Sequence, residues 1–125
     1  MAVQFQAPGL SVIGLIGVDL NNANTDFPLD ISYLKYVARR VTACGPSVSL
    51  GSSPATLGLF TLPNGGGTAV IPLTGLTALN GVTKFADVPL TFTNYATLSR
   101  VYFRVGTPHG SPATIDVYIE ITPLI

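Results

Sequence analysis

Short runs in which hydrophobic and polar residues tend to alternate recur along the whole chain, and glycine or proline separates them. The 125 residues include 13 Gly and 10 Pro, and Val, Ile, Thr, Tyr and Phe are frequent between them. Alternation with a period of two residues is typical of strands that bury one face. Turn residues at regular intervals between such strands are typical of β-sandwiches and barrels. The pattern predicts an all-β fold, an antiparallel sandwich or barrel in one domain, 1–125.

The apolar runs define the strands that we expect. They are 2–7, 10–18, 31–43, 55–62, 68–73, 82–93, 98–105 and 114–121. The polar segment 21–28 is expected to be a loop, and PNGGG at 63–67 the tip of a hairpin. Pro89 places its strand at a sheet edge or breaks it. The neighbours Arg39 and Arg40 must point to opposite faces unless a bulge re-aims one of them.

The last two expected strands, 98–105 and 114–121, have the clearest alternation. The odd-numbered residues from Val101 and from Ile115 onward are apolar in both. Folding one strand against the other around the loop 106–113 pairs opposite charges, aromatic rings and core residues in one register. The pairs are Arg104 with Asp116, Arg100 with Glu120, Tyr102 with Tyr118, Phe103 with Val117 and Val101 with Ile119. A slip of one residue would destroy every pair, so the sequence predicts a hairpin.

The segment 9–18, GLSVIGLIGV, is the most apolar part of the first half of the chain. It is about half as long as a membrane-spanning helix, and no cation precedes it as in a signal peptide, since the first is Lys35. We expect no membrane insertion. Residues 1–18 are expected either to form an extended arm or intersubunit strand or to contribute an ordinary core strand at 10–18. The side chains expected to contact a neighbour in the first case are Phe5, Leu10, Val12, Ile13, Leu15 and Ile16.

Charge is scarce, which bears on the kind of partner. Asp, Glu, Lys and Arg make up 10% of the residues and the formal net charge is zero, whereas ordinary soluble domains contain about 25% charged residues. The six Lys and Arg residues are scattered, so nucleic-acid binding is not expected. A mean hydropathy of +0.50 with so little charge predicts poor solubility of a free monomer. We therefore expect partners to cover much of the surface.

His109 is the only histidine and lies in the loop GTPHGSPA. Proline and glycine already explain this loop as a turn. A catalytic histidine needs a nucleophile and an orienting carboxylate beside it, and the G-x-S-x-G pattern is absent. We expect His109 to be a surface or contact residue and the protein not to be an enzyme. The catalytic alternative would require a Ser and an Asp next to His109.

No metal site or cofactor is expected. One histidine and the lone Cys44 cannot supply a zinc site, and Cys44 cannot form a disulfide within the chain. The segment DLNNANTDFPLD, 19–30, lacks the central Gly and the final Glu of an EF-hand. It is interpreted as an Asx-rich turn, with a loose calcium site formed by Asp19, Asn21 and Asp26 left as the alternative.

The ending TLSRVYFRVGTPHGSPATIDVYIEITPL, 97–124, resembles the C-terminal hairpin of small proteins that decorate or cement the capsids of tailed bacteriophages. The shared features are a Leu-, Tyr- and Phe-rich strand with Arg, the loop 106–113 and the strand IDVYIEI at 115–121. The resemblance implies a β-sandwich or jelly roll without catalysis. It also implies a homodimer or homotrimer on the outer capsid surface, bound across neighbouring major-capsid subunits. Such a protein assembles in the host cytoplasm.

Two other functions remain open at this point. The protein could be a tail or fibre component of a virion instead of a capsid component. It could also be a small carbohydrate- or surface-binding module. In that case a face of tyrosines would bind the ligand, although tyrosines also enrich protein interfaces. The tyrosines concerned are Tyr33, Tyr36, Tyr102 and Tyr118.

Overall fold

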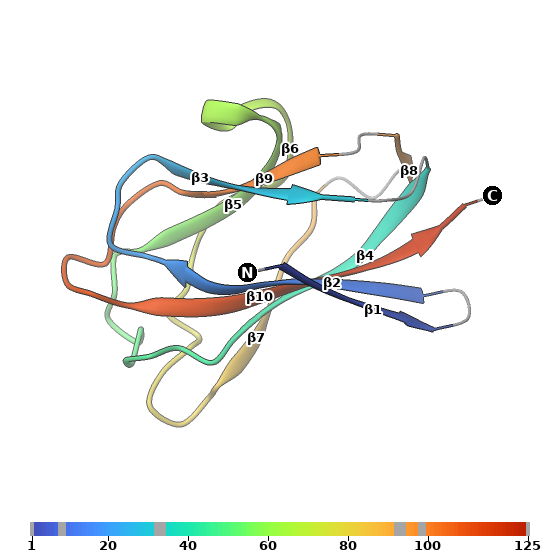
Figure 1. Ribbon diagram of the computed structural model, residues 1–125. Coiled ribbons are helices and arrows are strands. Elements are labelled where there is room, and N and C mark those ends of the chain that lie inside the picture. The colour runs from blue at the N-terminus through green and yellow to red at the C-terminus, as the bar shows by residue number, and fades with distance from the viewer. Residues whose placement is uncertain (1, 8–9, 32–34, 92–94, 98–99, 125) are drawn as a thin grey trace.

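The computed structural model describes residues 2–7, 10–31, 35–91, 95–97 and 100–124. These residues form β strands joined by loops and one short 3₁₀ turn, Pro63–Gly65. The strands are β1 (Ala2–Ala7), β2 (Leu10–Asp19), β3 (Thr25–Asp30), β4 (Tyr36–Cys44), β5 (Thr56–Leu62), β6 (Gly66–Gly75), β7 (Phe85–Val88), β8 (Tyr95–Ala96), β9 (Arg100–Val105) and β10 (Thr114–Pro123). Figure 1 shows them in two layers that face each other.

The two layers are antiparallel sheets. Sheet A has the strand order β1-β2-β10-β4-β7, with β8 also paired to β4, and sheet B has the order β3-β9-β5-β6. With β1 and β8 set aside, β2-β10-β4-β7 faces β3-β9-β5-β6, which is the strand order of a jelly roll. The predicted all-β antiparallel sandwich is confirmed, and its topology is that of a jelly roll.

Alternate residues of facing strands fill the space between the sheets. The odd-numbered residues of β9, and those of β10 up to Ile121, point inward and are buried. They are Val101, Phe103, Val105, Ile115, Val117, Ile119 and Ile121. Burying a side chain of this size stabilises the fold by about 1.5–3 kcal/mol. The alternation in the sequence therefore marks the inward faces of these two strands correctly.

The predicted pairing of these two strands is wrong. β9 pairs with β3 and β5 in sheet B, whereas β10 pairs with β2 and β4 in sheet A. The loop 106–113 is an arch that carries the chain from one sheet to the other (Figure 1). The apolar faces of β9 and β10 meet across the core and not side by side, because in a sandwich each sheet contributes its own inward face.

The predicted cross-strand pairs are therefore corrected as well. Arg104 pairs with Asp26 at 2.8 Å and Arg100 with Asp30 at 2.7 Å, so their partners lie in β3. The remaining members of the expected pairs have neighbours in their own sheets. Asp116 accepts a hydrogen bond from Gly17 N, Glu120 lies 3.5 Å from Arg40, Tyr102 is opposite Pro28 and Phe60, and Tyr118 is opposite Gly14 and Thr42.

The segment 21–28, expected to be a loop, contains the start of β3. Phe27 and Leu29 alternate there with Asp26, Pro28 and Asp30, and Leu29 is buried. Pro28 is tolerated because β3 is an edge strand of sheet B, where one side of the backbone needs no ladder partner.

Three local predictions are confirmed. β5 and β6 form the expected hairpin, with its tip at 63–65. β7 ends at Val88, directly before Pro89. The register between β10 and β4 shifts so that Arg40 is opposite Glu120 while Ala38 is opposite Ile121. Arg39 is the extra residue of this bulge, and the bulge leaves both arginines exposed.

Candidate functional site

Four loops, 20–24, 45–55, 76–84 and 106–113, lie at the same end of the sandwich, on the left in Figure 1. We call this end of the molecule the loop end. The arch 106–113 is fastened to the first of these loops by backbone bonds. Leu20 N donates to Ala113 O at 2.9 Å and His109 N donates to Leu20 O at 2.8 Å.

The other two loops extend the same hydrogen-bonded chain. Ser47 N donates to Thr114 O at 3.0 Å, which fastens the loop 45–55 to the start of β10. Leu50 N then donates to Leu79 O at 2.8 Å, and this bond fastens the loop 45–55 to the loop 76–84. Loops held by backbone bonds lose little conformational freedom when a partner binds. The loop end is thus a preformed surface.

His109 lies within this bonded region and contacts Ser53. Its Nδ1 is 2.6 Å from Ser53 Oγ, which also accepts a hydrogen bond from Ala55 N at 3.1 Å. Ser53 is 8% exposed. Over the described ranges, no carboxylate contacts His109, so the pair lacks the orienting acid of a catalytic triad. The geometry suits a clamp between two loops.

The sequence did not reveal Ser53 as the partner of His109. The two residues are 56 positions apart, and no motif spacing connects them. The serine near His109 in the sequence, Ser111, is exposed.

The loop end carries two strongly exposed apolar side chains. Val82 is 89% and Phe85 69% exposed. The turn that holds Val82 is rigid, because Asn80 Oδ1 accepts hydrogen bonds from Val82 N and Thr83 N, both at 2.8 Å. We call Val82 and Phe85 the apolar tip. Val82 and Phe85 are three positions apart in the sequence, and exposed apolar patches are typical of interaction sites.

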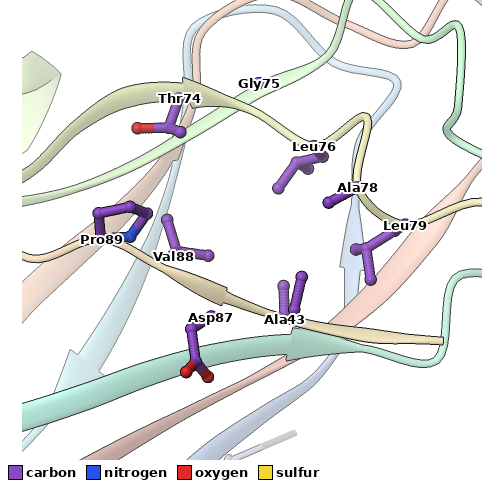
Figure 2. A pocket seen from close by; sticks show the side chains of 10 residues that line it. Ala43, Thr74, Gly75, Leu76, Ala78, Leu79, Asp87, Val88 and Pro89 are labelled. Atoms are coloured by element: carbon purple, nitrogen blue, oxygen red, sulfur yellow. The ribbon is translucent and has the colours of Figure 1, made fainter. Parts of the chain in front are cut away.

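A small cavity lies between the loop 76–84 and β7, and Figure 2 shows its lining. Its volume is about 70 Å³, and most of its lining is apolar, with Thr74 and Asp87 as the polar members. Pockets for small molecules have volumes of about 300–1,000 Å³. This cavity is too small to be the main ligand site.

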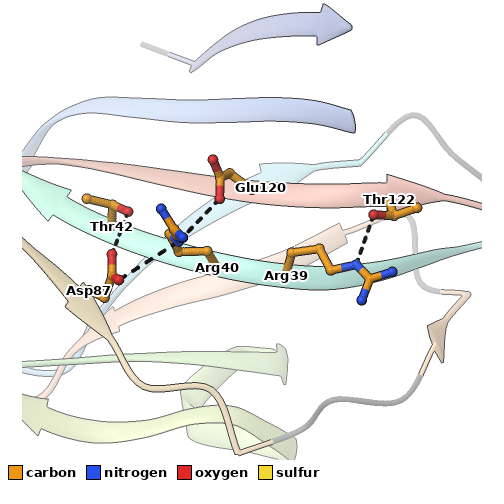
Figure 3. A network of polar contacts seen from close by, with 6 residues as sticks. All are labelled: Arg39, Arg40, Thr42, Asp87, Glu120 and Thr122. Atoms are coloured by element: carbon orange, nitrogen blue, oxygen red, sulfur yellow. Dashed lines mark hydrogen bonds and ion pairs between the residues drawn. The ribbon is translucent and has the colours of Figure 1, made fainter. Parts of the chain in front are cut away.

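A polar network lies on the outer face of sheet A across β7, β4 and β10, as Figure 3 shows. Arg40 Nε lies 3.5 Å from Glu120 Oε2 and 3.8 Å from Asp87 Oδ2, and Thr42 Oγ1 donates to Asp87 Oδ1 at 3.1 Å. Arg39 Nε donates to Thr122 Oγ1 at 3.0 Å beside it. These exposed pairs contribute little to stability. They pair the Arg40 guanidinium with the carboxylates of Asp87 and Glu120.

Tyr36, Tyr102 and Tyr118 do not form one face. Tyr36 is 2% exposed and lies in the core, where burial raises the pKa of its phenol. Tyr102 and Tyr118 are on the outer faces of sheet B and sheet A respectively, because their strands belong to different sheets. The predicted sugar-binding face is therefore wrong for these three residues. Tyr33 lies outside the described residues.

The Asp/Asn-rich segment forms turns and pairs. Asp19 accepts hydrogen bonds from Asn21 N and Asn22 Nδ2, both at 2.8 Å, as in an Asx turn. Asp26 accepts from Arg104 and from Asn64 N, so its oxygens have partners on other strands. The part of the chain that the structure describes contains no group of three or more His, Cys, Asp or Glu side chains arranged to hold a metal ion.

Cys44 has a free, half-buried thiol. Burial, with the negative charge of Asp116, raises the pKa of the Cys44 thiol. A raised pKa lowers the fraction of thiolate, which is the reactive form.

The N-terminal segment forms strands within sheet A. β1 and β2 form a hairpin, and β2 also pairs with β10. Ile13 is buried in the core, so the core-strand alternative holds for it, whereas Val12, Leu15 and Ile16 are half-buried. The side chains of Phe5 and Leu10 lie outside the described part of the structure. The contact of these residues with a neighbour stays a prediction.

Two further findings concern the chain as a whole. None of the described residues belongs to a helix long and apolar enough to cross a membrane. Comparisons with protein-family models, curated proteins and solved structures returned no match.

Proposed function

We propose that this protein is a non-enzymatic structural component of a virion, a decoration or cement protein that binds across major-capsid subunits on the capsid surface. The observation that carries the proposal is the apolar tip, in which Val82 and Phe85 are exposed on a preformed loop end. A chain with 10% charged residues that also exposes such side chains is suited to being covered by a partner.

The mechanism is physical. A capsid fails where its subunits separate, and a bound clip adds its own binding free energy to each seam, provided that it contacts two subunits at once. Many weak copies then act together through multivalency. A preformed contact surface supports this role because little free energy is lost in ordering loops on binding.

The fold supports the proposal only by analogy. Jelly rolls occur in viral capsid proteins and also in lectins, and a fold by itself does not define a function. The carbohydrate-binding alternative is not favoured, because the described tyrosines of its expected ligand face, Tyr36, Tyr102 and Tyr118, are distributed over the core and two opposite surfaces.

The test is sedimentation of a gentle lysate of the native source, with detection of this chain in each fraction. We expect the chain to travel with very large particles that contain the major-capsid protein and to dissociate only under harsh treatment. A chain that sediments as a free species of a few copies would overturn the proposal. Association with tails or fibres alone would replace the capsid location with the tail alternative.

A further inference from the structure

The edge strands of the sandwich differ in how they are protected. They are β1, β7 and the two-residue β8 in sheet A and β3 and β6 in sheet B. An edge exposes unpaired N–H and C=O groups, and proteins block it with proline, charge, short strands or a covering segment. β3 contains Pro28, and β7 is four residues long and ends before Pro89. These two edges cannot readily accept another strand.

The β6 edge is blocked as well. It contains Pro72, and Thr91 N donates to Val70 O at 2.9 Å, so part of its backbone is already covered. β1 differs from these other edge strands. Its six residues, AVQFQA, include neither proline nor a charged side chain. Over the described ranges, β1 pairs with β2 alone.

We infer that β1 is the self-association edge of this protein, and that it pairs with β1 of a second copy to join the two A sheets. Every pairing in sheet A is antiparallel. Continuing that pattern with an identical strand requires a twofold axis, which is the commonest symmetry of homo-oligomers. A second copy of this chain fits this geometry, because β1 carries no charge that would repel the same strand of another copy.

The sequence of β1 is complementary to itself in the two central registers. In one register Gln4 is opposite Gln4 of the second copy, and Val3 is opposite Phe5. In the other, Phe5 is opposite Phe5 and Gln4 is opposite Gln6. The register centred on Phe5 matches apolar with apolar residues and amides with amides throughout, and the register centred on Gln4 does so except where Ala2 meets Gln6. Neither register places like charges opposite each other, because β1 has no charge.

Such a dimer would supply the second contact that a capsid clip needs. β1 and β7 are at opposite edges of sheet A, so joining two copies through β1 leaves both apolar tips at the far ends. Nine strand spacings separate the two β7 strands, which corresponds to about 40 Å. The binding of one dimer to two capsid subunits rests on the proposed function, whereas the dimer itself does not.

The test begins with sedimentation velocity of the purified full chain, which we expect to be a dimer that dissociates on dilution. The double variant Gln4→Lys/Gln6→Lys places lysine opposite lysine of the second copy in both registers. The repulsion between these like charges should give a monomer. Mixing this variant with Gln4→Glu/Gln6→Glu should restore a dimer that contains one copy of each variant. The matched control Thr68→Lys/Thr77→Lys adds the same charge at exposed threonines and should remain a dimer.

Two outcomes overturn the inference: a wild-type chain that stays monomeric at all concentrations, or a Gln4→Lys/Gln6→Lys variant that still dimerises. If the lysine variant does not fold, cysteine cross-linking decides instead. In a Cys44→Ser background, either Gln4→Cys or Phe5→Cys should form a disulfide between copies, because directly opposite residues have the required spacing. Failure of both cysteine variants to cross-link overturns the inference.

The dimer and the proposed function can fail separately. A dimer that does not bind particles would overturn the capsid proposal and leave the inference intact. A monomer that binds particles would overturn the inference and leave the capsid proposal intact.

Discussion

Arg104 Nη1 lies 2.8 Å from Asp26 Oδ1, and the two side chains are 12% and 16% exposed, which makes this the most sheltered ion pair in the described structure. The other carboxylate oxygen of Asp26 accepts a hydrogen bond from Asn64 N at 2.7 Å. One carboxylate therefore connects β3, β9 and the tip of the β5–β6 hairpin.

We predict that Arg104 and Asp26 are energetically coupled. Arg104→Met and Asp26→Asn should each lower the free energy of unfolding by about 1–3 kcal/mol, because each leaves a sheltered partner without its charged hydrogen bond. In a double-mutant cycle measured by urea unfolding, the coupling should be at least about 0.5 kcal/mol.

The matched cycle pairs Arg104→Met with Asp116→Asn. These residues lie in different sheets, so their effects should add within about 0.5 kcal/mol. Coupling of Arg104 to Asp116, with none to Asp26, would instead support a hairpin of β9 and β10.

The spacing of charges explains why the sequence could not distinguish these two pairings. Arg100 and Arg104 are four residues apart, and so are Asp26 and Asp30, and so are Asp116 and Glu120. Either acidic strand therefore satisfies both arginines. The sequence pattern identified the inward faces, but alternation does not report which of two sheets a strand joins.

Two of the predictions, the jelly roll and the hairpin of β9 with β10, are incompatible with each other. In that strand order β9 and β10 belong to opposite sheets, and the only hairpin within β2–β10 is β5–β6. Signals that are local to the chain, such as the turn at 63–67 and Pro89, predicted the structure correctly. Contacts between distant loops, such as that of Ser53 with His109, have no counterpart in sequence spacing.

We predict that the carboxyl group of Asp30 titrates below its ordinary pKa of about 3.9. The hydrogen bond from Arg100 lowers the pKa of Asp30 in the folded state. A carboxyl whose folded-state pKa is lowered contributes stability above its unfolded pKa, and this contribution is lost as the pH falls through the folded value. The effect on stability should be small and confined to pH below about 4, because the pair is exposed.

An NMR titration of the Asp30 side chain checks this directly. Arg100→Gln should return its midpoint to the ordinary range, whereas Arg39→Gln, which removes a bond to Thr122, should not. A midpoint that does not respond to Arg100→Gln would contradict the assignment of the cause.

The clamp between Ser53 and His109 should stabilise the loop end. Ser53→Ala removes the acceptor of Ala55 N and the partner of His109, so we expect a loss of about 1–2 kcal/mol. Amide exchange at Ala55 and His109 should accelerate in the same variant. Ser52→Ala, at an exposed neighbouring position, should change stability by less than about 0.5 kcal/mol.

The same serine tests the catalytic alternative. A nucleophilic serine reacts with a fluorophosphonate probe, and we expect none of the probe on Ser53 by mass spectrometry because no described carboxylate orients His109. Stoichiometric labelling that His109→Ala abolishes would contradict a purely structural role.

Gly58 should not tolerate a side chain. A Cβ atom there would lie 2.8 Å from Phe60 Cε2 and 2.9 Å from the backbone oxygen of Ile71. The backbone contact cannot be relieved by rotating a side chain, so Gly58→Ala should cost about 1–3 kcal/mol. Gly81→Ala is the control, since nothing lies within 4 Å of its Cβ position. Equal thermal midpoints for the two variants would show that β5 and β6 are not packed this closely.

The apolar tip offers a test in which function and stability should separate. Val82 and Phe85 are exposed, so Val82→Ser/Phe85→Ser should change the free energy of unfolding by no more than about 0.5 kcal/mol per substitution. If both side chains become buried against capsid subunits, each should contribute about 1.5–3 kcal/mol to binding. Their joint removal should then weaken particle binding by at least about a hundredfold. Leu62→Ser/Leu73→Ser removes two other exposed apolar side chains and should leave binding intact. If the two double variants weaken binding equally, general surface hydrophobicity and not the tip would account for the attachment.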